Sequence, residues 1–157
     1  MRRLLSIAAL FLSFGLGFAS LAVAQSEIYV PALAEIMSTA QWRHIKLWFA
    51  GKHANWELAS YELRQVRASL EDAATHYHGI PVEYVGATVG PILTISAAIE
   101  AKDSMRFIKG YNALTASCNA CHEGVGRGFI VIQVPTASPF SDQSFAPPKP
   151  PQPSSRP

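Results

Sequence analysis

The chain of 157 residues is long enough for one ordinary domain once removable segments are subtracted. Its formal charge of +2 comes from Arg2 and Arg3, and without these two residues 11 basic side chains face 11 acidic ones. Nucleic-acid-binding proteins carry a basic face or stripe that matches the phosphates, so we expect no nucleic-acid partner.

The first 24 residues have the features of a secretory signal peptide. Arg2 and Arg3 form a short basic start, Leu4 to Val23 is almost entirely apolar or small, and Ala22-Val23-Ala24 is an A-x-A cleavage site before Gln25. A retained membrane anchor is the alternative, because the apolar stretch just reaches the roughly 20 residues that a span needs. The small-residue site favours cleavage, and hence export to the periplasm.

Two helices are predicted in the first half of the mature chain. The first covers about Pro31 to Ala50, and its inner face recurs at spacings of three and four: Leu33, Met37, Ala40, His44, Leu47 and Gly51. The second covers about Asn55 to His78, with Asn55 as N-cap and Gly79 and Pro81 behind it. Its inner face is the clearest in the chain: Trp56, Ala59, Leu63, Val66, Leu70, Ala73 and Tyr77.

Two further helices follow after a longer connection. The third is expected from about Gly90 to Lys102, beginning with Pro91, with an inner face of Val89, Ile92, Leu93, Ser96 and Ile99. The fourth is expected from about Ser104 to Glu123 behind Asp103 as N-cap. Its inner face is Phe107, Tyr111, Leu114, Cys118 and Cys121.

The predicted fold is all-α: an antiparallel up-down-up-down four-helix bundle over residues 25–134, since short connections make sequential helices antiparallel neighbours. Phe129 to Val134 is an apolar run that we expect to lie back on the bundle, because left bare it would aggregate. Eight of the 23 residues from 135 to 157 are proline, which predicts an extended tail, disordered toward its end.

The motif Cys118-Asn119-Ala120-Cys121-His122 carries the chemistry of the chain. C-x-x-C-H is the attachment sequence of a c-type haem. Positions i, i+3 and i+4 share one helix face, so both thiols can add to the two vinyl groups of a single haem while the imidazole reaches the iron. We therefore expect one covalent haem c on Cys118 and Cys121, with His122 as proximal ligand.

Other roles of a C-x-x-C pair have less support. A structural disulfide remains open, but a thiol-disulfide redox centre belongs in a βαβ setting that the helical pattern does not provide. Zinc requires four tetrahedral ligands, and His122 with two thiolates leaves one missing. The only cysteines of the chain are Cys118 and Cys121, so no second pair completes a zinc site.

Four helices with this motif at the end of the fourth resemble the cytochrome c-prime family and its methionine-ligated, low-spin relatives. The resemblance covers about Pro31 to Glu123 and implies thioethers at Cys118 and Cys121 and proximal ligation by His122. Two features depart from the family pattern. Gly126 stands where the family has a basic residue four positions after the histidine, and the extension from Phe129 to Phe145 is additional.

The sixth iron ligand decides between functions. Met37 and His44 both lie on the inner face of the first helix, but the beginning of that helix is level with the end of the antiparallel fourth, where His122 lies. Side chains lean toward their own helix N-terminus, which also favours Met37. The alternatives are His44, or an iron with no sixth protein ligand.

Ligation by Met37 predicts a one-electron carrier that exchanges electrons with periplasmic redox proteins and is not an enzyme. An open sixth position predicts instead a five-coordinate protein that binds NO or CO in an apolar pocket of Leu33, Met37 and Trp42. A third class is an interaction module, since proline-rich segments dock in aromatic grooves. Candidate partners of the haem propionates are Arg43, Lys46 and Arg127, and related bundles often form homodimers.

Overall fold

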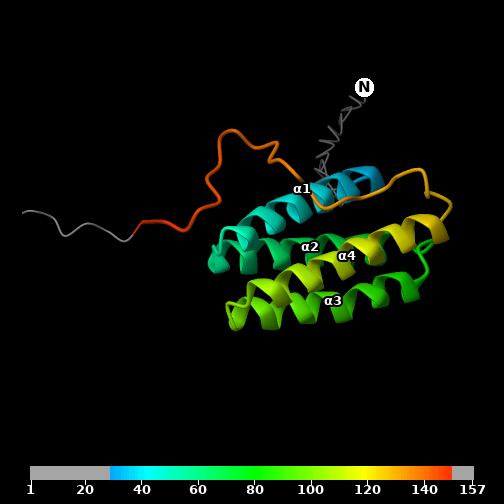
Figure 1. Ribbon diagram of the computed structural model, residues 1–157. Coiled ribbons are helices and arrows are strands. Elements are labelled where there is room, and N and C mark those ends of the chain that lie inside the picture. Colours follow the sequence, from blue (N-terminus) through cyan, green and yellow to red (C-terminus); the bar gives the residue numbers. More distant parts are fainter. Residues whose placement is uncertain (1–28, 150–157) are drawn as a thin grey trace, which may run out of the picture.

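The computed structural model describes residues 29–149, so the expected signal peptide and the last residues of the tail lie outside the described part. Four helices form an antiparallel bundle (Figure 1). They are α1 (Leu33–Lys52), α2 (Trp56–His76), α3 (Val82–Glu100) and α4 (Ser104–Gly124). The all-α, four-helix prediction is confirmed.

Side-chain caps begin two of the helices at the predicted positions. The Asn55 side chain accepts a hydrogen bond from the Leu58 amide at 3.2 Å, and the Asp103 carboxylate accepts one from the Arg106 amide at 2.9 Å. Each cap satisfies one of the amides that the first turn of a helix leaves without an intrahelical partner. The short connections before both caps make α1 and α2, and likewise α3 and α4, antiparallel neighbours.

The prediction for α3 was wrong in its start and partly wrong in its inner face. The helix begins at Val82, and Pro91 lies inside it rather than at its first turn. Proline has no amide to donate to the carbonyl of Ala87, and the Ser117 hydroxyl of α4 lies 3.3 Å from that oxygen. The earlier start also removes the long connection expected between the second and third helices.

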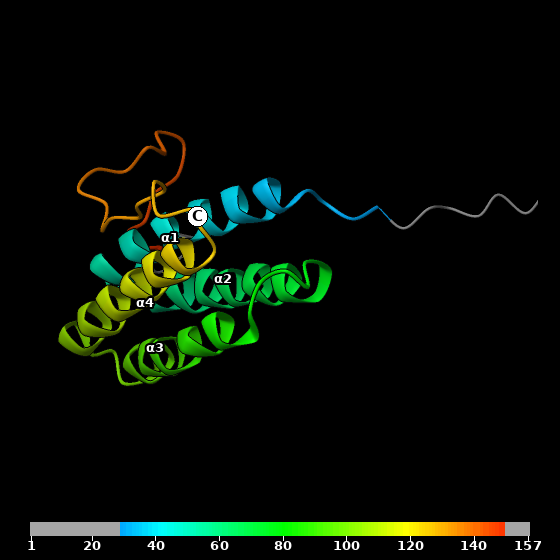
Figure 2. The same ribbon diagram turned by 90° about the vertical axis from the view of Figure 1, so that its right-hand side faces the viewer.

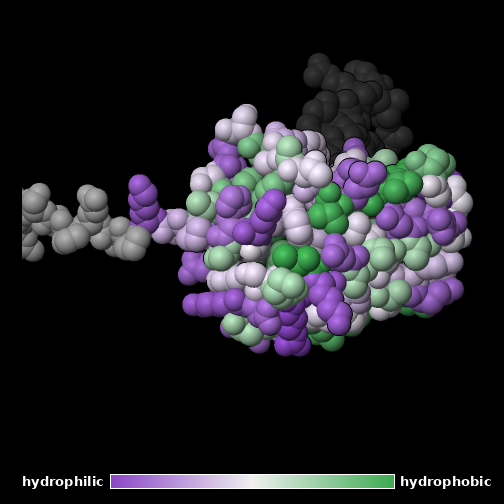
Figure 3. Space-filling model, viewed as in Figure 1, coloured by the Kyte–Doolittle hydropathy of each residue, from purple (hydrophilic) through white to green (hydrophobic). Residues whose placement is uncertain are grey.

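Composition explains why the inner face of α3 was assigned incorrectly. Val89 and Leu93, expected inside, are 52% and 63% exposed, whereas Ile92 and Ile99 are buried as predicted. Apolar residues occur all around this helix, so the period of the pattern does not define one face. Hydrophobic residues also lie among hydrophilic ones on the molecular face shown in Figure 3. By length and composition α3 could even cross a membrane, a test that core helices of soluble proteins also pass.

The hydrophobic core is concentrated toward one end of the bundle. There the ring of Phe107 lies against Gly51, and a Cβ at Gly51 would overlap that ring. We call the contact between the C-terminal half of α1 and the N-terminal half of α4 the closed half of the α1/α4 interface. Its large, fully buried side chains include Leu47, Phe107, Tyr111 and Leu114.

After α4 the chain turns back and runs beside α1 (Figures 1 and 2). Phe140 packs edge-on against Trp42, and Phe145 packs against Phe49 with ring centroids 5.6 Å apart. The Asn55 amide also donates to the carbonyl of Ala146 at 3.2 Å. The first part of the proline-rich tail is therefore packed on the bundle, as an irregular segment without helix or strand up to residue 149.

Candidate haem-binding site

The register between α1 and α4 is set by a buried polar contact. His44 Nε2 lies 2.9 Å from the hydroxyl of Thr115. Seven residues from His44 toward the start of α1 is Met37, and seven residues from Thr115 toward the end of α4 is His122. Seven residues are about two helical turns, or about 10 Å, and return to nearly the same face. Met37 and His122 are therefore level with each other on facing sides of the two helices.

Packing changes along α4 at Thr115. Up to that residue the inner positions are buried, whereas the side chains of Cys118, Asn119, Cys121 and His122 are only partly buried. On α1, Met37 is likewise partly buried. We call this region, where α1 begins and α4 ends, the open half of the α1/α4 interface. Its residues include Met37 on α1 and the three side chains of the motif on α4, none of them fully buried.

The thiols of Cys118 and Cys121 are free and lie one turn apart on α4. Burial, with a smaller contribution from Cys121, raises the pKa of Cys118 to about 11, and burial also raises the pKa of Cys121. Reactive thiol-disulfide centres depend on a lowered thiol pKa, because the thiolate is the nucleophile. The site lacks that property, which weakens the redox-centre alternative.

The imidazole of His122 is held by the chain that follows α4. Its Nδ1 lies 2.7 Å from the carbonyl oxygen of Ile130, so Nδ1 carries the proton and donates it. Nε2 has no hydrogen-bond partner among residues 29–149, and its lone pair is available to a metal. A histidine that ligates a metal through one nitrogen generally donates from the other to a carbonyl or carboxylate.

No protein-family model, curated protein or solved structure matches the chain at a significant level. The interpretation of the site therefore depends on the chain's own residues.

His44, the alternative sixth ligand, has both ring nitrogens engaged. Nε2 lies 2.9 Å from the Thr115 hydroxyl, and Nδ1 lies 2.8 Å from the Tyr111 hydroxyl, which also reaches the His44 carbonyl at 2.9 Å. Burial lowers the pKa of His44 to about 4, consistent with a neutral ring. Met37 has no competing polar contact of this kind, and the geometry favours it over His44.

The predicted propionate partners are placed differently from one another. Arg43 points toward α2 and pairs with the buried carboxylate of Glu62 at 3.3 Å. Lys46 lies over the ring of Phe140, 4.6 Å from its centroid. Arg127 is exposed just beyond α4, where its guanidinium contacts only the Gly126 carbonyl at 3.4 Å among the described residues. Of the three, Arg127 is the one beside the motif.

Two further arrangements bear on the chemistry of the site. Within residues 29–149 no three His, Cys, Asp or Glu side chains converge as a group that could hold a metal ion, whereas a structural zinc site uses four ligands. Trp42, expected in a distal pocket, is half exposed and packs on Phe140. The side chains that do meet the needs of a covalent haem are two thiols one turn apart and an adjacent imidazole with Nε2 available.

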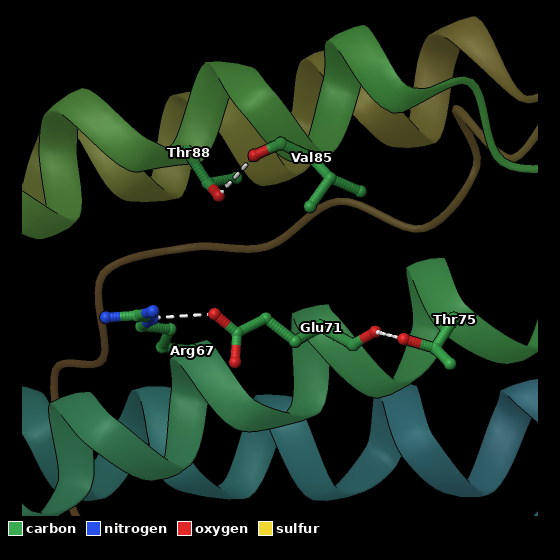
Figure 4. A network of polar contacts seen from close by, with 5 residues as sticks. All are labelled: Arg67, Glu71, Thr75, Val85 and Thr88. Atoms are coloured by element: carbon green, nitrogen blue, oxygen red, sulfur yellow. Dashed lines mark hydrogen bonds and ion pairs between the residues drawn. The ribbon is translucent and has the colours of Figure 1, made fainter.

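The clefts described by the structure lie elsewhere. One of about 220 Å³ runs between α2 and α3, beside Arg67, Glu71 and Thr88 (Figure 4). The polar contacts drawn there stay within single helices, as in the Arg67–Glu71 pair at 2.7 Å. The motif lies on α4, outside the two helices that line this cleft.

Several residues that contact the motif or set the register of α4 carry no recognisable signal in the sequence. Asn119 lies at a variable position of C-x-x-C, and Ile130 acts through its backbone carbonyl, which no side-chain pattern reports. Thr115 and Tyr111 bind His44 from α4, and only the hydrophobic spacing of Tyr111 was visible beforehand.

Proposed function

We propose that the chain is an exported mono-haem c-type cytochrome that carries single electrons between periplasmic proteins. Haem would be bound through Cys118 and Cys121, with His122 as the proximal iron ligand. The observation that carries the proposal is the His122 imidazole, whose Nδ1 is bound to the Ile130 carbonyl while Nε2 remains available on the same helix face as the thiols. The resemblance to the cytochrome c-prime family adds support at the level of the motif and the bundle.

The chain's residues would each have a definite task. Haem supplies the one-electron couple. Cys118 and Cys121 anchor it covalently, His122 binds iron, and Met37, level with His122 across the open half, is the proposed sixth ligand. A thioether ligand favours the ferrous state and raises the potential. The engaged nitrogens of His44 remove the competing ligand, and Arg127 is the proposed propionate partner.

Mass spectrometry of the chain, exported from cells able to mature other c-type cytochromes, tests the covalent bond directly. We expect the mass of the mature polypeptide plus one haem, and the mass of bare polypeptide when both cysteines are replaced by alanine. Bare polypeptide from the unchanged chain would contradict the proposed function.

Optical spectra test the role of Met37, with Met105→Ala as the matched control. Met105 is 77% exposed and lies in the first turn of α4, at the opposite end of the helix from the motif. We expect a low-spin spectrum with a weak near-infrared thioether band in the ferric protein. Met37→Ala should abolish both features and Met105→Ala should retain both.

Exposure of the ferrous protein to CO separates the carrier from the gas-binding alternative. A six-coordinate iron with Met37 bound should change its spectrum slowly or only at high CO. High-spin spectra in both oxidation states and rapid CO binding would instead assign the chain to the five-coordinate, NO- or CO-binding class.

A further inference from the structure

Residues 127–134, which we call the strap, begin with a sharply defined turn. Gly126 has a φ of +70°, its amide donates to the carbonyl of Glu123 at 3.1 Å, and the amide of Arg127 donates to the carbonyl of His122. This pair of bonds with a left-handed residue is a Schellman helix end, which favours glycine. The Ile130 amide then donates to the carbonyl of Arg127 at 2.8 Å and turns the chain back along α4.

Asn119 holds the strap at two points. Its Nδ2 donates to the carbonyl of Ile132 at 2.9 Å, and its Oδ1 accepts from the amide of Ile132 at 2.7 Å. The side chain thus pairs with the strap as a neighbouring strand would. Two residues earlier on the strap, the carbonyl of Ile130 reaches His122 Nδ1 at 2.7 Å.

The side chains of the strap show that it is not held by apolar burial over most of its length. Phe129 is 79% exposed and Val131 is 63% exposed, whereas Val134 packs partly against the core. We expected this apolar run to lie back on the bundle. Its backbone and Val134 do so, but the side chains of Phe129 and Val131 are exposed. Hydrogen bonds from α4 keep the middle of the strap in place.

We propose that the strap, locked by Asn119, positions the proximal imidazole by presenting the Ile130 carbonyl to His122 Nδ1. This inference rests on the proposed function and assigns Asn119 and the strap as positioning residues. The carbonyl fixes the ring orientation and leaves Nε2 as the nitrogen that can bind iron. By accepting a hydrogen bond from Nδ1–H it would also make the imidazole a stronger electron donor to iron, which favours the ferric state and lowers the reduction potential.

The strap accounts for both departures from the cytochrome c-prime pattern. At position 126 the left-handed backbone of the Schellman end favours glycine over a side chain such as a basic residue. The extension that follows supplies a partner for the histidine from the backbone instead. Gly126 and the strap are thus two parts of one arrangement around His122.

Asn119→Ala tests the proposal, with Asn112→Ala as its control. Asn112 lies seven residues earlier on α4 and is exposed, so its replacement leaves the strap untouched. We expect Asn119→Ala to retain covalent haem, to raise the reduction potential, and to speed hydrogen exchange of the Ile132 amide and of the His122 Nδ1 proton about tenfold or more. Asn112→Ala should change none of these quantities.

The outcomes separate the inference from the proposed function. If the unchanged chain carries haem but Asn119→Ala leaves the potential and the Nδ1 exchange rate unaltered, the strap does not position His122 while the cytochrome assignment stands. If the unchanged chain has the mass of bare polypeptide, the proposed function fails and this inference with it. Asn119→Asp is a second variant: it keeps the acceptor for the Ile132 amide but loses the donor, so the potential should fall between those of the wild type and Asn119→Ala.

Discussion

The two halves of the α1/α4 interface use the same pair of helices for different purposes. In the closed half Gly51 makes room for the ring of Phe107, and large side chains fill the space completely. In the open half the facing residues are Met37 and the motif side chains, all partly buried. Comparison of the halves teaches that a bundle can concentrate its stability at one end and leave the other end available for a bound group.

Truncation of one aromatic ring in the closed half and of one on the strap, which follows the open half, should give the largest contrast. Phe107 is 1% exposed and Phe129 is 79% exposed. Phe107→Ala should lower the free energy of unfolding by about 3–5 kcal/mol, because it removes a buried ring and leaves a cavity. Phe129→Ala should stay within about 0.5 kcal/mol. Denaturant unfolding measures both, and similar losses would contradict the difference in packing between the closed half and the strap.

The pH dependence of stability should report the buried His44 at the border of the halves. Its folded pKa of about 4 lies below the ordinary value of 6.5, so only the unfolded chain binds a proton between these values. Stability should fall by about 3 kcal/mol as the pH drops from 6.5 to 4 and level off below that range.

Controls are needed because other groups titrate nearby. Burial raises the pKa of Glu62 despite its pairing with Arg43, and this carboxyl contributes stability that is lost as the pH rises, opposite in sign to His44. His44→Gln should remove the contribution of His44 to the pH dependence of the free energy of unfolding. Replacement of the exposed His76 should leave this pH dependence unchanged. NMR titration of the His44 ring in the unchanged chain tests the same prediction if His44→Gln does not fold. A titration midpoint near 6.5 would contradict the lowered pKa of His44.

Removal of one hydroxyl should have a smaller effect. The Tyr111 hydroxyl is fully buried and lies 2.8 Å from His44 Nδ1 and 2.9 Å from the carbonyl oxygen of His44, so Tyr111→Phe leaves buried polar groups of His44 without this partner. We expect a loss of about 1–3 kcal/mol in the free energy of unfolding. Tyr61 is 44% exposed and provides the matched control, for which Tyr61→Phe should be nearly neutral. Equal effects would mean that the buried contact contributes nothing.

The smallest predicted effects have opposite signs at two glycines. Gly126→Ala, at a φ of +70°, should destabilise by about 1 kcal/mol because an L-residue is strained there. Gly86→Ala, in the second turn of α3 with open space around its Cβ, should stabilise by about 0.5–1 kcal/mol. Thermal unfolding of the two variants measures both signs, and destabilisation of similar size at both sites would argue against a special turn at the end of α4.

Local chemistry made much of the fold predictable from the sequence. Asn55 and Asp103 mark helix starts by their side chains, and the inner faces of α1, α2 and α4 follow from apolar spacing. The position of Met37 along α1, opposite His122 on α4, could be predicted because the two helices are antiparallel and both rise by the same distance per residue. The start of α3 was harder to predict, because a proline such as Pro91 normally lies in the first turn of a helix. In this structure Pro91 lies inside α3, and the Ser117 hydroxyl lies beside the Ala87 carbonyl that the proline leaves without an amide donor.

The rest of the site depends on contacts that carry no sequence signal. The partner of His122 is a backbone carbonyl, which any residue at position 130 would provide. Asn119 lies where the motif permits any residue, so its two bonds to Ile132 are visible only in three dimensions. The engagement of Arg43 by Glu62 likewise depends on how α1 and α2 meet.

The contact between His44 and Thr115 joins residues 71 positions apart, whereas α1 with α2 and α3 with α4 are neighbours along the chain. Loop-closure entropy delays distant contacts relative to local ones, so we expect the two helical hairpins to form first and the first and last helices to meet last. During that interval Cys118, Cys121 and His122 stay accessible on a hairpin that has not yet docked. This order of assembly would leave the thiols accessible to the proposed haem attachment before the bundle closes.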